Sequence, residues 1–301
     1  MTVFGQGAAS RRSLAACGCL VAGVLLVSCS SVFQGEPSGG NGAPSSVPYE
    51  HPTGAKDVLV SIDVAGGFLP MEFNLRNTAE FLLLGDGTVI AAGVTDMRYP
   101  GPAINPLQTT TISEGQIQEL LAAAEAAGLL GGEVDYGNPA VTDLPDTHVD
   151  VTVGGSTSSQ SAYALGFDNG TSLGLTDSQI TAREALQDFI DTAQALIQAD
   201  SELYAPAEVV AYRLSAQAAP PIEEPDLVQE PRSWPIPTLP PPAAETELSS
   251  CVVISGQEAA DLLTALQDAN ELTPWLIGSD SEPPARMAFR PQLPGDSGCK
   301  Q

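Results

Sequence analysis

The stretch that decides the fold is Phe81-Leu82-Leu83-Leu84-Gly85-Asp86-Gly87-Thr88-Val89-Ile90-Ala91. Two apolar runs flank a short turn in which an aspartate stands between two glycines. Apolar runs of this length are typical of buried strands, and glycine tolerates the left-handed backbone of a tight turn. The stretch therefore predicts a β-hairpin. A phosphate-binding loop fits poorly, because the glycines precede a strand and the lysine of such a loop is missing.

Further strands are expected on both sides of this hairpin. Apolar and polar residues alternate at 58–64 and at 148–153, so one face of each strand is apolar. The second of these strands is expected to return at 160–165. Short β-rich runs in the last third of the chain predict three more strands, at 209–214, 251–254 and 287–290.

Three stretches have the start signal of a helix. In each, a Ser or Thr is followed three residues later by Gln or Glu, the pattern of a capping box, and then by an apolar stripe of helical spacing. The pairs are Ser113 with Gln116, Thr176 with Gln179, and Ser255 with Glu258. Gly128 is placed where a left-handed residue would end the first helix.

The order of the elements indicates the fold class. Strands and helices do not alternate as βαβ units, which favours an α+β fold. We expect an antiparallel sheet with two or three capped helices on one face. The stretch 215–250 holds nine prolines and is no helix, but its apolar Trp234 and Ile236 indicate that it docks on the body of the protein.

The first 28 residues have the pattern of an export signal. Arg11 and Arg12 precede an apolar run at 14–27, which ends in Leu26-Val27-Ser28-Cys29. The run is shorter than the roughly 20 apolar residues of a membrane-spanning helix. An uncleaved membrane anchor is the alternative interpretation. The general and the twin-arginine export routes both remain open.

The segment Leu26-Val27-Ser28-Cys29 resembles the lipobox of bacterial lipoproteins, and the Ala-, Gly- and Pro-rich composition is similar to that of actinobacterial proteins. The resemblance implies cleavage before Cys29 and acylation of its sulfur, for example with palmitate. Acyl chains would anchor the protein in the cell membrane on the extracytoplasmic face. The hairpin and the segment Thr142-Asp143-Leu144-Pro145 also resemble small α+β modules of such lipoproteins, a resemblance that brings no catalytic residue.

The sequence predicts four parts. Residues 1–28 are the lipoprotein signal peptide, and 29–56 form a flexible tether rich in Gly, Ser and Pro. Residues 57–200 form the α+β domain. The part at 207–301 either packs on this domain or forms a second one.

Two cysteines remain once the signal is removed and Cys29 is acylated, namely Cys251 and Cys299. Outside the cytoplasm, such a pair predicts a disulfide. The disulfide would close a long loop and stabilise the C-terminal part by about 4 kcal/mol in the chain-entropy view.

The chain is strongly acidic, with a formal net charge of −26, and Lys56 and Lys300 are its only lysines. This charge argues against nucleic acid as a partner and against a basic face that docks on anionic lipid. The expected partners are the membrane, through the anchor on Cys29, and an unidentified envelope protein or ligand.

The two histidines of the chain, His51 and His148, limit catalysis. His51 is expected in the tether, where nothing holds a general base in place. His148 lies on the polar face of a predicted strand. The sequence has neither a Gly-x-Ser-x-Gly elbow nor a His-Glu-x-x-His motif. We therefore identify no catalytic residue and do not expect an enzyme.

The strongest candidate site is an acidic stretch, Asp135, Asp143, Asp146 and Asp150, together with His148. Carboxylates on a loop suit Ca²⁺, although the spacing is not that of an EF-hand. Alternatively, Asp143 makes a turn before the following strand by bonding nearby backbone groups. The turn is the preferred interpretation, so no cofactor is expected and Ca²⁺ is the alternative.

The sequence thus predicts a lipid-anchored cell-envelope protein with a binding or structural role. Two alternatives remain. One is an extracytoplasmic hydrolase that uses carboxylates, because acidic residues are plentiful and their distances cannot be read from a sequence. The other is an inhibitor-like module that blocks a partner enzyme through exposed loops.

Overall fold

The predicted hairpin lies at the centre of a seven-stranded sheet in the computed structural model. Its strands are β2 (Phe81–Leu84) and β3 (Thr88–Ala92). Gly87 has φ +86°, and the Asp86 carboxylate accepts a hydrogen bond from the backbone N of Thr88 at 3.0 Å. The turn thus needs glycine for its backbone and aspartate for its hydrogen bond.

The structure describes residues 48–95, 98–167, 173–197, 200–219, 222, 224–244, 246–277 and 283–299. Cys29 and the rest of the predicted signal lie outside the described residues. Residues from Val47 onward form one compact unit.

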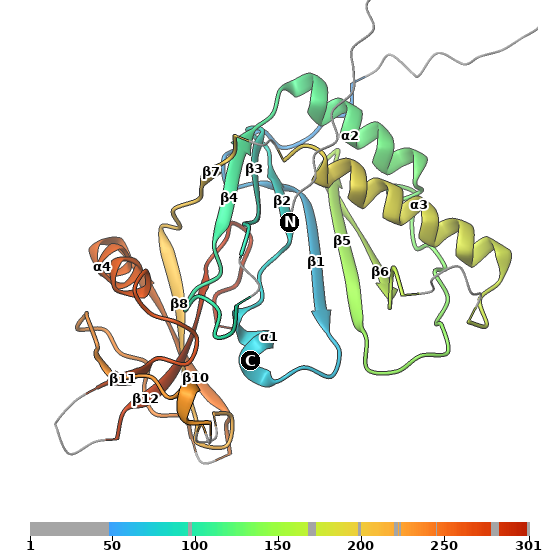
Figure 1. Cartoon of the computed structure of the whole chain (residues 1–301). Helices are drawn as coiled ribbons and strands as arrows, with labels where there is room; N and C mark the ends of the chain where they lie inside the picture. The colour runs from blue at the N-terminus through green and yellow to red at the C-terminus, as the bar shows by residue number, and fades with distance from the viewer. Residues whose placement is uncertain are drawn as a thin grey trace, which may run out of the picture. The chain divides into compact units, whose positions relative to one another are not determined.

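The first sheet has the strand order β6-β5-β1-β2-β3-β4-β7, and all its pairs are antiparallel. Figure 1 shows β1, β5 and β6 on one side of the hairpin and β4 and β7 on the other. The remaining strands are β1 (Val58–Gly66), β4 (Leu107–Thr111), β5 (Pro145–Val153), β6 (Ser156–Tyr163) and β7 (Glu202–Leu203).

Two helices, α2 (Glu114–Ala126) and α3 (Asp177–Gln194), cover one face of this sheet (Figure 1). Both begin with the predicted capping box, from Ser113 and from Thr176. Gly128, with φ +77°, follows the C-cap of α2. The apolar stripes of the helices and the inward faces of the strands form the largest buried cluster of the described residues. The α+β fold class is confirmed.

A second sheet forms from the last third of the chain, in the order β10-β8-β12-β11-β9. The β11–β9 pair is parallel and the others are antiparallel. Its strands are β8 (Glu208–Leu214), β9 (Arg232–Ser233), β10 (Ser249–Ser255), β11 (Pro274–Leu276) and β12 (Ala285–Pro291). We call residues 48–207 the amino-terminal half and residues 208–299 the carboxy-terminal half.

The third predicted helix, α4 (Gly256–Leu266), covers this second sheet. Its predicted capping box is wrong, because the Ser255 side chain makes no cap hydrogen bond. The Glu258 carboxylate accepts instead from the backbone N of Thr238, at 3.0 Å. That hydrogen bond ties the proline-rich stretch to α4, and this long-range contact cannot be read from local spacing.

The proline-rich stretch is docked, as predicted. It contains a short 3₁₀ helix, η1 (Pro225–Leu227), as well as β9. Trp234 stacks against Phe289 at 6.2 Å between ring centroids and meets the edge of Trp275 at 5.7 Å. Such aromatic contacts hold an extended segment that has no helical hydrogen bonds of its own.

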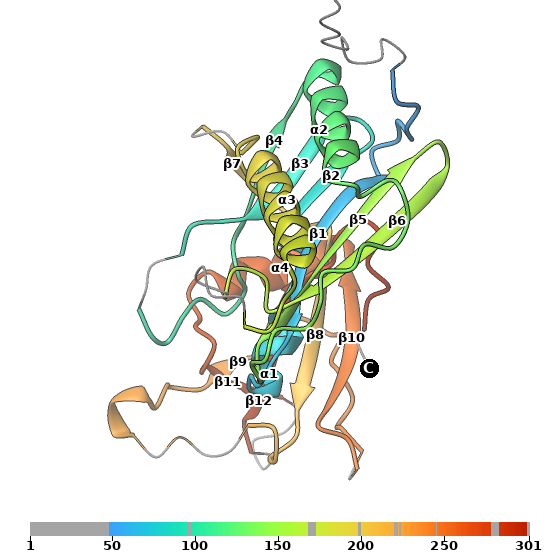
Figure 2. The same ribbon diagram turned by 90° about the vertical axis from the view of Figure 1, so that its right-hand side faces the viewer.

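The helix α1 (Met71–Arg76) joins the two sheets. Leu75 is buried in a cluster with residues of β8 and β12. Arg76 forms an ion pair with Glu271, and Arg286 of β12 forms one with Glu72 at 3.2 Å. The helix turns in Figure 2 stand directly against the strands of the second sheet. This helix and its ion pairs were not predicted.

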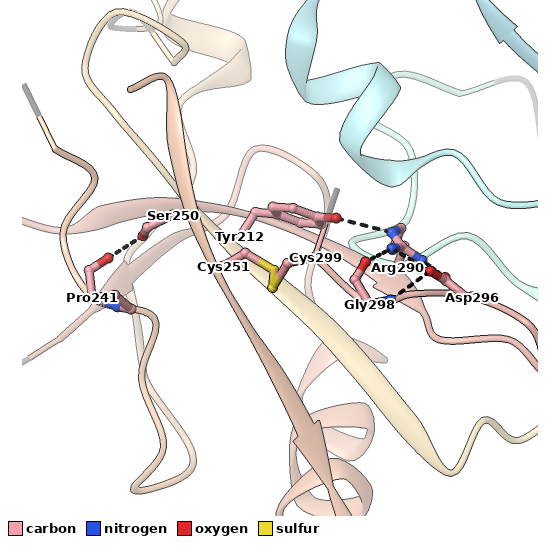
Figure 3. Close-up of a disulfide and its surroundings, with 8 residues drawn as sticks. All are labelled: Tyr212, Pro241, Ser250, Cys251, Arg290, Asp296, Gly298 and Cys299. Atoms are coloured by element: carbon pink, nitrogen blue, oxygen red, sulfur yellow. Dashed lines mark hydrogen bonds and ion pairs between the residues drawn. A yellow bond between two sulfur atoms is a disulfide. The ribbon is translucent and has the colours of Figure 1, made fainter. Parts of the chain in front are cut away.

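The predicted disulfide joins Cys251 of β10 to Cys299, with Cα atoms 5.8 Å apart (Figure 3). Beside it, the fully buried Arg290 guanidinium pairs with Asp296 and donates to the Tyr212 hydroxyl at 3.2 Å. Arg290 also donates to the carbonyl of Gly298. Figure 3 shows these groups converging on the end of the chain, which the disulfide and the ion pair therefore fasten to the sheet together.

The residues just before β1 differ from the expectation of a free tether. Tyr49 donates its backbone N–H to the Gln118 side chain of α2 at 2.7 Å, and its hydroxyl bonds Glu125. The ring of His51 is 4% exposed and lies 3.2 Å from the Glu114 carboxylate. Residues 48–56 thus pack on the described body, because one aromatic and one imidazole ring find partners on α2.

Candidate functional site

The acidic stretch does not form one site. The Asp135 carboxylate accepts from the Gln179 amide at 3.0 Å and from the backbone N of Gly137 at 2.9 Å, and these bonds lower its pKa. Asp143 has φ +66°, and its carbonyl accepts from the backbone N of Phe68 at 3.2 Å. Asp135 thus fastens a loop to the start of α3, and Asp143 adopts the left-handed backbone that suits a turn.

The other two aspartates lie on β5. Asp146 is in register with Ala65 of β1, and Asp150 with Ser61. Within the described residues, no three His, Cys, Asp or Glu side chains come together in a way that would hold a metal ion. The Ca²⁺ alternative therefore gains no support from this stretch.

His148 is exposed on β5, as predicted. A hollow of about 450 Å³ beside β6 is lined by His148, Asp150 and Glu133. None of these three side chains makes a hydrogen bond within the described part of the chain. Catalytic carboxylates need neighbours that hold them in place, so the hollow does not favour the hydrolase.

A different feature marks a surface for binding. Ten large apolar side chains are exposed in the described part of the chain, and six of them lie in the segments that connect strands at one end of the first sheet, five in loops and one in α1. We call these six residues the apolar rim. They are Phe68, Leu69, Phe73, Val94, Tyr99 and Phe167. Phe68 is 87% exposed and Val94 is 91% exposed. Side chains this exposed are not core residues at the edge of a packing gap, and together they form an apolar patch on the surface.

The strand register shows that these loops share one end of the sheet. Gly66, the last residue of β1, is paired with Pro145, the first residue of β5. Tyr163, the last residue of β6, is paired with Asp146. β3 also ends on this side, since its Ala91 is paired with the first residue of β2. The connections that follow β1, β3 and β6, the first of which contains α1, therefore carry the rim (Figure 1).

The described chain begins at the opposite end. The Gly85 amide of the hairpin turn donates to the carbonyl of Asp57 at 2.9 Å, and Gly154 of the β5–β6 turn donates to Glu50 at 2.7 Å. β1 then runs nine residues to the rim, which is roughly 30 Å of strand. The rim thus faces away from the end where the chain enters the fold.

Acidic residues flank the rim. Glu80 and Asp143 are exposed at this end, and Asp146 is half-buried there. The β3–β4 loop contributes one positive charge at this end, Arg98, so the three carboxylates leave the border of the rim negatively charged. An apolar patch with an acidic border attracts a partner whose own apolar patch is bordered by Lys or Arg.

The rim was missed in the sequence, although a signal for it exists. Gly66-Gly67-Phe68-Leu69-Pro70 places two large apolar residues between strand-ending glycines and a proline. Both glycines have positive φ, and this backbone carries Phe68 away from the sheet. Apolar residues inside a turn signal are candidates for a surface role rather than for the core.

No family model matches the chain, and the search of curated proteins found no match. Of the helices among the described residues, none combines the length and the hydropathy that a bilayer span requires.

Proposed function

We propose that this chain is a lipid-anchored protein of the cell envelope that binds another envelope protein through the apolar rim. The anchor rests on Leu26-Val27-Ser28-Cys29 and the apolar run before it. The observation that carries the binding role is the gathering of six exposed apolar side chains at one end of the first sheet.

The position of the rim favours a protein partner over the bilayer. A chain held at Cys29 enters the fold at the far end of β1, so the rim points away from the point of entry. The acidic border and the net charge of −26 oppose contact with anionic lipid. The partner would present an apolar patch edged by basic residues.

The inhibitor-like alternative uses the same surface. Phe68 projects from a loop held by backbone bonds, which suits insertion into a cleft of a partner enzyme. The two roles separate once the partner is known. An inhibitor abolishes the activity of its partner at stoichiometric amounts, and a scaffold or adaptor leaves that activity in place.

In-cell photocrosslinking tests the binding surface. A photoreactive residue replaces Phe68 or Val94 in the full chain, and matched controls carry it at Val228 or Leu276, which are exposed apolar residues of the carboxy-terminal half. We expect one discrete partner protein at both rim positions and none at the controls. With that partner purified, Phe68→Ser should weaken binding by at least about tenfold, since a buried aromatic anchor contributes 2 kcal/mol or more.

Two results would argue against the proposal. Equal crosslinking at all four positions would show that the apolar rim is not a specific binding surface. Binding of the non-acylated chain to phosphatidylcholine vesicles through Phe68 would show that the rim contacts a bilayer and not a protein. Palmitate labelling tests the anchor separately. The label should be lost in Cys29→Ala and kept in Cys251→Ala.

A further inference from the structure

A second feature, independent of the rim and the anchor, is a hollow of about 330 Å³ where the two sheets meet. We call it the junction pocket. Leu107 of β4 and Leu266 of α4 are buried in it, while Leu203 of β7 and Leu263 of α4 line it and remain accessible. Four prolines complete the lining with rigid apolar surface. Its volume is at the lower end of the range for small-molecule sites, which are usually concave and mostly apolar.

The junction pocket is uncharged. Its lining contains no Asp, Glu, Lys, Arg or His, in a chain with 37 acidic residues. A charged ligand group inside it would lose its water and gain no ion pair, which costs several kcal/mol. The lining therefore selects neutral groups.

The lining has three polar side chains, of which Asn105 accepts a hydrogen bond from Arg76 at 3.3 Å and the other two are free to bind a ligand. The hydroxyl of Tyr204 and the amide of Gln267 make no hydrogen bond to any described residue. The Tyr204 phenol is a hydrogen-bond donor across the physiological range, because the ordinary pKa of tyrosine is about 10 and burial raises the pKa of this one further. An apolar pocket with a few such groups orients an amphiphile by its polar end.

We infer that the junction pocket binds an uncharged amphiphile, whose hydrocarbon chain contacts Leu203, Leu263 and Leu266 and whose hydroxyl meets Tyr204 and Gln267. A monoacylglycerol or a prenyl alcohol has this chemistry. The inference does not depend on the proposed protein partner, because no rim residue lines the pocket.

The test uses residues 30–301, which retain the whole compact unit and lack the acyl chains of the anchor. Monolauroylglycerol is titrated below its critical micelle concentration against a neutral naphthylamine probe. Laurate and dodecyltrimethylammonium, with the same chain length, are the charged comparisons. We expect displacement by the neutral ligand and at least about tenfold weaker displacement by both charged ones.

Variants locate the site. Leu203→Gln, at a side chain 80% exposed, should fold normally and weaken binding by about 5- to 20-fold. Tyr204→Phe should weaken it by about 3- to 10-fold, the equivalent of one neutral hydrogen bond. Leu276→Gln, an exposed leucine outside the pocket, is the matched control and should bind like the unaltered chain.

Three outcomes would overturn the inference. They are no displacement by monolauroylglycerol, equally tight binding of laurate, and an equal loss in Leu203→Gln and Leu276→Gln. Each is distinguishable from failure of the proposed function, which is read from crosslinks at Phe68 and Val94.

Discussion

The two halves of the molecule are stabilised by different kinds of interaction. Each packs one face of a sheet against helix, two helices in the first half and one in the second. The amino-terminal half buries the larger apolar cluster, under two helices with complete capping boxes. The carboxy-terminal half has a smaller cluster, one helix without a cap bond, a disulfide and a buried ion pair. A small core thus depends on cross-links that a large one does not need.

Two buried tyrosines repeat this contrast. The Tyr136 hydroxyl is buried in the amino-terminal half and has no hydrogen-bond partner among the described residues. The Tyr212 hydroxyl, in the carboxy-terminal half, accepts from the Nε of Arg290. An apolar core tolerates an unpaired hydroxyl at a cost, whereas a polar network uses one as a partner.

The largest effect is expected from Arg290→Met. This change leaves the Asp296 carboxylate, 16% exposed, without its ion-pair partner and should cost about 3–5 kcal/mol. Tryptophan fluorescence is the measurement, because Trp234 and Trp275 both lie in the carboxy-terminal half. The double variant Arg290→Met with Asp296→Leu should recover part of the loss. A cost below about 1 kcal/mol would mean that the ion pair does not hold this half together.

Loss of the disulfide is expected to come next. Cys251→Ser with Cys299→Ser opens a loop with a sequence separation of 48 and should cost about 2–4 kcal/mol. Urea unfolding followed by fluorescence should shift more than unfolding followed by far-UV circular dichroism, which also reports α2 and α3. Equal shifts for both probes would show that the halves unfold as one cooperative unit.

Removing the hydroxyl from each of the two buried tyrosines should have smaller effects on stability, and the two effects should differ. Tyr212→Phe removes a hydrogen bond to a charged group and should cost about 1.5–3 kcal/mol. Tyr136→Phe removes a hydroxyl that has no partner, so stability should stay unchanged or rise by up to about 1 kcal/mol. Thermal unfolding of both variants decides it. Equal losses would contradict the difference between the two cores.

The smallest effect concerns the join between the halves. Burial raises the pKa of Glu72 above its ordinary value of 4.5, so the folded state binds its proton more tightly than the unfolded state. Its contribution to stability is present below pH 4.5 and falls as the pH rises through the raised pKa. Glu72→Gln should remove this slope from the free energy of unfolding. The exposed Glu119→Gln should keep it, and identical pH profiles for both variants would refute the assignment.

Much of the fold could be predicted from local sequence patterns. The β2–β3 hairpin, the capping boxes at Ser113 and Thr176, and the strands at β1 and β5 are each encoded within a few residues of sequence. Gly87 and Gly128 have the backbone that their positions predict. Such signals are readable because propensity, turn chemistry and period agree in one short window.

Long-range pairing could not be read in the same way. Nothing in the sequence near Ser255 indicates that the Glu258 carboxylate accepts a hydrogen bond from the backbone N–H of Thr238 and does not cap its own helix. The six-residue α1 is too short for a periodic signal, and its ion pairs reach residues about 195 and 214 positions away. These contacts depend on which surfaces meet after the chain has folded.

The sequence by itself predicted most of the strands, the main helices and the pairing of Cys251 with Cys299, because spacing and composition act over short distances or by elimination. The strands β4, β7, β9 and β11 were not predicted. Only the tertiary structure divided the strands into two sheets, exposed Phe68 and Val94 together at one end, and left an uncharged pocket between the halves. The physical reason is that the exposure of a side chain and the shape of a cavity depend on how segments distant in sequence pack together. No local sequence pattern specifies that packing.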